Sequence, residues 1–219
     1  MNRPLAVRTR RRAGAGRRLI YIPILHTEAD LGGLARSVRR VTTERLGRRA
    51  WEQNVNAIGR LWRDLRRTVD GWELPWEKVR LYQDGLPRCG QEVKIVKAVA
   101  GAGSQNHQLL LSLARRGATL MGTESPALLL QEYTLVQQAL ARGDSQAAAA
   151  VDRRQQAQSR ALLVRRDRYI ARRVNQSLRA GEIGLLFLGM LHFPQAYLAK
   201  DIRVSYPFLR PPRPRRRMT

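Results

Sequence analysis

The chain has 219 residues, 43% of them hydrophobic, and a formal net charge of +24. That length and composition suit one sizeable folded domain, and no apolar run approaches the ~20 residues that a membrane-spanning helix needs. The single cysteine, Cys89, excludes an intrachain disulfide, and no secretory signal pattern precedes the first apolar run. We therefore expect a cytoplasmic protein without a membrane segment.

Much of the positive charge lies at the two ends of the chain. Residues 1–18 contain seven arginines and residues 210–219 contain five more, with no acid in either segment. Both segments are rich in Arg, Pro and Gly, a composition typical of disorder. We expect two basic tails around a single domain at 19–209, and tails of this kind can bind nucleic acid nonspecifically through counterion release.

The first half of the domain predicts a strand, a long helix and a second strand. Residues 19–26 (LIYIPILH) form an apolar run typical of a strand that is buried on both faces. From 50 to 69, apolar residues recur every three or four positions, which predicts an amphipathic helix with an arginine-rich outer face. Residues 78–82 predict a short strand, and the turn-forming residues 84–87 (DGLP) follow it.

The second half alternates in the same way. Helices are expected at 92–100 and after Ser104, a typical helix cap, with His107 in the first turn. A short strand at 118–121 precedes a helix that starts near Pro126, and a long charged helix spans 151–179. The apolar run 185–192 (LLFLGMLH) and a short strand at 201–204 complete the chain. This alternation predicts an α/β fold with helices packed around a central, largely parallel sheet.

Two histidines occupy matching places, because His26 and His192 each end an apolar strand. Ligands bind beyond the carboxyl ends of the strands in open α/β sheets. Glu124 follows another predicted strand, and Glu28 lies just after His26. Imidazole and carboxylate groups together bind divalent metals or transfer protons. The alternative is that both histidines only cap their strands and bond to nearby loops.

The long helix contains Arg165-Arg166-Asp167. This run predicts an ion-paired surface cluster, with Arg166 or Asp167 turned toward the site as the alternative. Glu132 lies about two helical turns after Glu124 if a helix begins there at once. It either shares the face toward the site or is solvated.

One stretch runs Arg166-Asp167-x-x-Ile170-Ala171-x-x-Val174-Asn175-x-x-Leu178-x-x-Gly181 and continues as GLLFLGMLH at 184–192. It resembles the end of the TraB/Tiki-like clan, which includes TraB pheromone-shutdown proteins, Tiki proteases, erythromycin esterases and ChaN-type haem-binding proteins. That clan pairs an early Gly-x-x-His with a late one, and Gly189 and His192 match the late motif. Pro23 replaces the early glycine before His26. The resemblance implies an α/β fold with both histidines near one pocket.

Two functional hypotheses follow. In the first, the protein is a divalent-metal-dependent hydrolase of a small-molecule or peptide substrate, with His26, His192, Glu124 and Glu28 as candidate ligands. Glu124 or a histidine would activate water, and Arg166 would stabilise negative charge on the substrate. In the second, it is a noncatalytic protein that binds haem or nucleic acid. A shared metal site requires the two histidine rings to lie within about 10 Å of each other.

Overall fold

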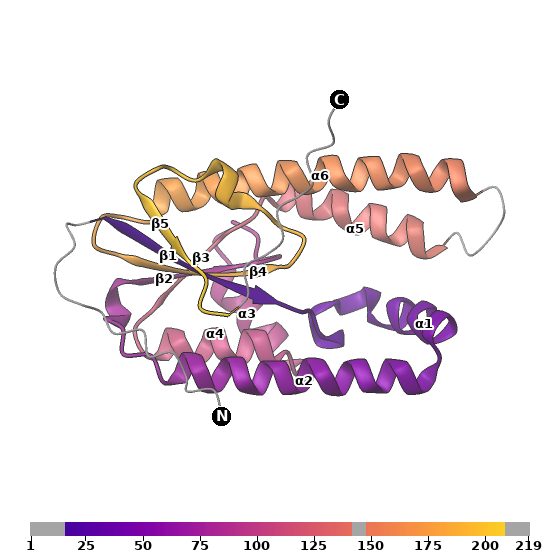
Figure 1. The fold of residues 1–219 in the computed structure, drawn as a ribbon, viewed down its shortest axis with the longest axis horizontal. Helices are drawn as coiled ribbons and strands as arrows, with labels where there is room; N and C mark the ends of the chain where they lie inside the picture. The colour runs from indigo at the N-terminus through magenta and orange to yellow at the C-terminus, as the bar shows by residue number, and fades with distance from the viewer. Residues whose placement is uncertain (1–15, 142–147, 209–219) are drawn as a thin grey trace.

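A computed structural model describes residues 16–141 and 148–208 of the chain, so most of both predicted tails lies outside the described residues. Its centre is a sheet of five parallel strands in the order β3-β2-β4-β1-β5 (Figure 1). The strands are β1 (Arg17–Ile24), β2 (Val79–Gln83), β3 (Thr119–Met121), β4 (Ile183–Gly189) and β5 (Ile202–Ser205). The predicted α/β fold with helices around a parallel sheet is confirmed.

Helices connect the strands, as parallel pairing requires. The elements η1 (Glu28–Asp30), η2 (Gly32–Leu34), α1 (Ala35–Leu46), α2 (Arg48–Asp70) and η3 (Trp76–Lys78) lie between β1 and β2, where η marks a 3₁₀ turn. Between β2 and β3 come α3 (Glu92–Gly101) and α4 (Gln105–Arg115), and between β3 and β4 come α5 (Pro126–Ala141) and α6 (Ala148–Ser177). The turn η4 (Pro194–Tyr197) precedes β5. In the described part of the chain, no helix is both long and apolar enough to cross a membrane.

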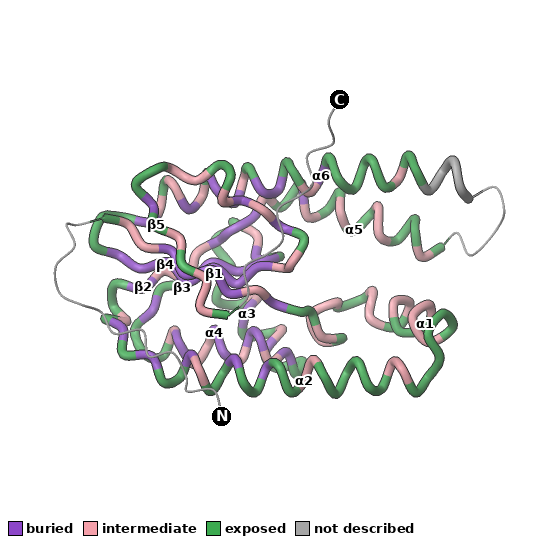
Figure 2. Tube along the Cα trace, in the orientation of Figure 1, coloured by how far each residue is buried: buried purple, intermediate pink, exposed green. Residues whose placement is uncertain are grey.

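Side chains alternate between the two faces of the sheet. On β1, Ile20, Ile22 and Ile24 belong to the cluster formed with α2, α3 and α4. Leu19 and Tyr21 belong to the second cluster, on the face that α6 covers. Both faces of the central strands are therefore buried (Figure 2). Polar side chains lie instead just beyond the ends of the strands.

The strand ends also correct the boundaries expected from the sequence. β1 begins at Arg17, so two arginines assigned to the N-terminal tail belong to the sheet. Arg17 forms an ion pair of 2.7 Å with Asp201, next to β5. The apolar runs 19–26 and 185–192 each continue two or three residues past the strand, which ends at Ile24 and at Gly189. Ile24 pairs with Gly189, so the two histidines follow strands that end level with each other.

Candidate functional site

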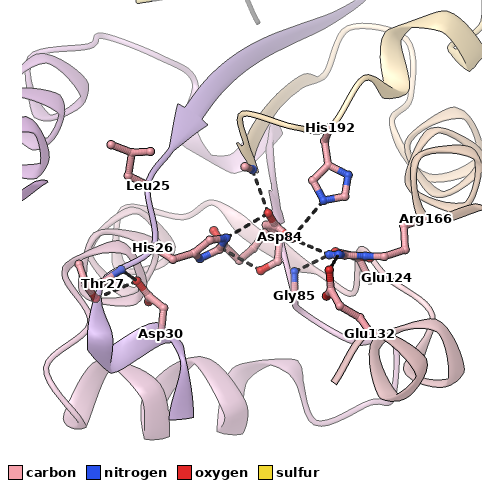
Figure 3. Close-up of polar contacts among 12 residues, drawn as sticks. Leu25, His26, Thr27, Asp30, Asp84, Gly85, Glu124, Glu132, Arg166 and His192 are labelled. Atoms are coloured by element: carbon pink, nitrogen blue, oxygen red, sulfur yellow. Dashed lines mark hydrogen bonds and ion pairs between the residues drawn. The ribbon is translucent and has the colours of Figure 1, made fainter. Parts of the chain in front are cut away.

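Asp84 lies at the centre of a polar cluster beyond the carboxyl ends of the strands (Figure 3). It follows β2, the neighbour of β4, and its Oδ2 accepts a hydrogen bond of 2.8 Å from the Gly189 backbone N–H. His26 Nε2 lies 3.4 Å from Oδ2, and His192 Nε2 lies 3.7 Å from Oδ1. Burial alone would raise the pKa of Asp84, but the contact with His26 and the charges of His192 and Arg166 hold that pKa well below its usual range. Both imidazoles thus contact one carboxylate.

His192 is oriented from behind by Asp167 of α6. Its Nδ1 lies 2.6 Å from Asp167 Oδ1, and the other carboxylate oxygen accepts the Phe193 backbone N–H at 2.9 Å. Because Asp167 can only accept when it is ionised, Nδ1 carries the proton and Nε2 faces Asp84. Burial opposes a charged imidazole, yet the hydrogen bond to Asp167 and the charge of Asp84 raise the pKa of His192 above its ordinary value.

Arg166, also on α6, joins three carboxylates. Its Nε and Nη2 donate to the two oxygens of Glu124 at 2.7 and 2.6 Å, and Nη2 donates to Asp84 at 2.9 Å. Its Nη1 donates to Glu132 of α5. Only 4% of the Arg166 side chain is exposed, and Glu124 raises the pKa of Arg166 against the opposing effect of burial.

Glu124 follows β3 and is fully buried. Its Oε1 also accepts the Gly85 backbone N–H at 2.9 Å. Burial and the neighbouring Asp84 raise the pKa of Glu124, while Arg166 opposes that rise. The carboxylate is therefore held by fixed donors on both oxygens, in a site where burial raises its pKa even with Arg166 beside it.

His26 stands on a loop that is tied to the start of α4. The carboxylate of Asp30 accepts the Thr27 backbone N–H at 2.7 Å and the Ser104 hydroxyl at 2.5 Å, and His107 Nδ1 lies 3.3 Å away. Burial opposes ionisation of Asp30, but the contacts with His107, Ser104 and Thr27 lower its pKa to about 2. The contact with Asp84 raises the pKa of His26 despite partial burial.

Solvent reaches the cluster at two of its members. The side chain of His26 is 41% exposed and that of Glu132 is 43% exposed, whereas those of Asp84 and His192 are about 5% exposed or less. A cluster whose only role was structural would gain from closure on every side, because exposed ion pairs contribute little stability. His26 and Glu132 are therefore the members of the cluster that a ligand from solvent would meet first.

The structure brings together His26, His192, Glu124 and Arg166, all four residues proposed as catalytic from the sequence. Glu28, a candidate ligand, is exposed on η1 and forms no hydrogen bond or ion pair with the cluster among the described residues. The surface interpretation of Arg166 and Asp167 is wrong, because both are buried, while Arg165 is exposed and bonds to Gln131.

Sequence reasoning missed Asp84, which is central, and left Glu132 open between the site and solvent; its bond with Arg166 places it at the site. Asp84 precedes Gly85 in a sequence typical of a turn, so it was interpreted as a turn residue. It directly follows the last residue of β2 and therefore also lies at a strand end. The signal that could have identified it is the same one that identified Glu124. In each case an acid follows a short apolar strand by one to three residues.

The donor set suits a divalent cation. Asp84, Glu124 and His192 each offer a ligand atom within 4.8 Å of the others. Ligand atoms that share a metal at ~2.1 Å lie roughly 3 to 3.5 Å apart, close to the 3.7 Å between Nε2 of His192 and Oδ1 of Asp84. Nε2 of His26 lies 3.4 Å from the other oxygen, Oδ2, and is not part of this three-residue group. A second carboxylate behind a ligating histidine, as Asp167 is behind His192, is the common arrangement in metal sites.

Neither a protein-family model, nor a curated protein, nor a solved structure matches this chain. The chemistry of the cluster is therefore inferred from the residues themselves.

Proposed function

We propose that the protein is a divalent-metal-dependent hydrolase with its site at the carboxyl edge of the sheet. The metal would be held by Nε2 of His192 and the carboxylates of Asp84 and Glu124, with His26 on the exposed side of Asp84. One observation carries the proposal: Asp167 binds Nδ1 of His192 and leaves its Nε2 facing Asp84. That arrangement presents a basic nitrogen and a carboxylate oxygen to the same point.

The charges of the cluster support the same conclusion. Four carboxylates (Asp84, Glu124, Glu132 and Asp167) and one guanidinium (Arg166) sum to a formal charge of −3 when both histidines are neutral. A divalent cation would bring this to −1. Buried charge of one sign is costly unless it is compensated, so the cluster favours a cation.

The residues of the chain have distinct tasks in this proposal. A bound divalent ion would polarise the substrate and lower the pKa of coordinated water toward ~7. Asp167 fixes the tautomer of His192, and Arg166 donates to Asp84 and Glu124 and opposes the effect of burial on the pKa of Glu124. Glu132 offers an exposed carboxylate for proton transfer with solvent. Because three carboxylates already engage Arg166, its first role is to hold them, and contact with the substrate would require Glu132 to move.

The resemblance to the TraB/Tiki-like clan supports the proposal at specific residues. Gly189 of the late motif lies against Asp84, and a Cβ there would stand 2.8 Å from Asp84 Oδ2. The glycine is therefore needed for the carboxylate to approach the end of β4. The site also retains His26, although Pro23 stands where the clan has glycine.

Metal analysis tests the proposal directly. Purified full-length protein is compared with a His26→Ala, His192→Ala double variant and with His107→Ala, which removes the third histidine of the sequence. After incubation with Zn²⁺ or Mn²⁺ and removal of free ion, we expect wild type and His107→Ala to retain metal and the double variant to lose it. Equal metal content in all three would overturn the metal site.

Hydrolysis is then assayed on chromogenic ester, peptide and phosphodiester substrates. We expect metal-dependent turnover of one class in wild type and His107→Ala, and none in the double variant. Turnover that persists in the double variant would place the activity elsewhere. Metal binding without turnover on any class would overturn the hydrolase while leaving the metal site in place.

A further inference from the structure

The helical arm formed by α1 and the first half of α2 extends from the body without a core of its own. No residue of α1 is buried, and the buried residues of α2 are Trp62, Leu65 and Val69, all in its second half. In Figure 2 the residues of the arm are coloured as exposed or intermediate. Tertiary packing supplies most of the stability of protein helices. Because this arm buries so little, most of its side chains are available for contacts outside the chain.

The arm is nevertheless anchored. The Trp62 indole N–H donates to the Leu25 carbonyl at 3.0 Å, just before His26. The guanidinium of Arg39 on α1 lies 4.6 Å from the centre of the Trp51 ring on α2. These contacts fix α2 to the end of β1 and α1 to α2, so the outer face of α2 has a defined orientation.

That outer face has a uniform chemistry. An α-helix has 3.6 residues per turn, so residues three, four and seven positions apart share a face. Six residues of α2 lie on the face opposite its buried residues, within about 40° of a line parallel to the helix axis. With a rise of about 1.5 Å per residue, this line is about 27 Å long. All six are exposed, and all carry guanidinium or amide groups: Arg49, Gln53, Asn56, Arg60, Arg63 and Arg67. The face therefore combines hydrogen-bond donors with positive charge and includes no carboxylate.

The acids beside this line are already paired. Each acidic residue of α2 lies in an ion pair within the helix: Arg48–Glu52, Arg67–Asp64 and Arg66–Asp70. In the part of the chain that the structure describes, the guanidinium groups of Arg49, Arg60 and Arg63 have no hydrogen-bond or ion-pair partner. Three cations along one helix face are thus available to an external anion.

We propose that this face of α2 binds double-stranded DNA, with the arginines on phosphates and Gln53 and Asn56 toward the base edges. An α-helix fits the major groove of B-DNA, and Arg, Gln and Asn are the side chains that pair with base edges and phosphates there. The major groove of an RNA duplex is too deep and narrow for such a helix. A membrane-binding helix would need an apolar stripe on its exposed side, whereas the buried apolar residues of α2 face the body. This inference does not depend on the proposed hydrolase.

Salt-dependent binding to DNA tests the proposal. The full-length protein is titrated onto a fluorescent 20-bp duplex of mixed sequence at several salt concentrations, beside an Arg49→Gln, Arg60→Gln, Arg63→Gln variant. Each phosphate contact contributes about 0.9 to the slope of log affinity against log salt. Loss of three contacts should reduce that slope by about 2.7 and lower the affinity on the order of 100-fold at ~0.15 M salt.

Two matched variants separate a local surface from net charge. Lys94→Gln, Lys97→Gln, Arg203→Gln removes three exposed charges on α3 and β5 and should leave the slope nearly unchanged. Replacing the same three α2 arginines with lysine keeps the charge and should retain the slope. An equal loss in the α2 and control variants would assign binding to net charge and overturn the proposal. So would absent DNA binding in wild type, or binding only to vesicles of anionic phospholipid.

Discussion

Replacing Arg166 with methionine removes the guanidinium that contacts three carboxylates of the site while keeping an apolar stem. Only 4% of this side chain is exposed, and its loss leaves Asp84 and Glu124 buried without their hydrogen-bonded counter-charge. Removing one partner of a buried ion cluster costs about 3 to 5 kcal/mol. For a domain of this size, each kcal/mol lowers the Tm by roughly 2 to 4 °C, so we expect a decrease of roughly 6 to 20 °C.

The pH dependence of that loss identifies its cause. Burial already raises the pKa of Glu124, and without Arg166 both Glu124 and Asp84 take up protons more readily. The destabilisation should therefore be largest at neutral pH, where the carboxylates are charged, and should shrink as the pH falls toward 4. Adding Glu124→Gln to the Arg166→Met variant should recover about 1 kcal/mol or more at neutral pH, because it removes one uncompensated charge.

Urea unfolding followed by circular dichroism measures these free energies. Arg165→Met, one residue away on the exposed side of α6, is the matched control and should stay within about 0.5 kcal/mol of wild type. A loss below about 1 kcal/mol for Arg166→Met, or a loss that grows toward acid pH, would refute the charged and buried cluster.

Three further predictions concern neighbouring positions. Asp167→Asn removes the carboxylate behind His192 and should weaken metal affinity about 10- to 100-fold in a chelator competition; unchanged affinity would contradict the role of Asp167. Gly189→Ala places a Cβ 2.8 Å from a pinned carboxylate oxygen and should cost about 1 to 3 kcal/mol, whereas Gly101→Ala, with open space around its Cβ, should be near neutral on urea unfolding. Asp30 has its pKa lowered to about 2, so it contributes stability above its ordinary pKa that is lost as pH falls toward 2. Asp30→Asn should therefore flatten the acid side of the stability profile, and an unchanged profile would show that Asp30 contributes nothing.

Most of the fold could be predicted because the pattern of apolar residues within each short segment indicates whether that segment is a helix or a buried strand. The runs 19–26 and 185–192 are long enough to require cover on both faces, and the intervening helices force parallel pairing. The order of the strands was not predictable in this way. It depends on which helices pack on which face, and it places β2 beside β4. Asp84 thereby meets Gly189 and the histidines.

The site was harder to predict than the fold for a related reason. Arg166 lies in a helix with many exposed arginines, so its charge alone indicates a surface position. Its spacing indicates otherwise, because Arg166, Ile170 and Val174 recur every fourth residue and form one buried stripe. A charged residue in line with an apolar stripe is a better indicator of a buried site than the charge pattern of the helix.

The two imidazoles allow the cluster to reduce its negative charge in two ways that exclude each other. Either both imidazoles take up protons, which their raised pKa values favour, or both stay neutral and the cluster binds one divalent cation through Asp84, Glu124 and His192. Each brings the formal charge of the carboxylates and Arg166 from −3 to −1. A purely structural ion cluster would keep both protons until the pH exceeds the raised pKa values of the imidazoles. A metal site must release them when the ion binds, so metal affinity has to increase with pH until the imidazoles are deprotonated.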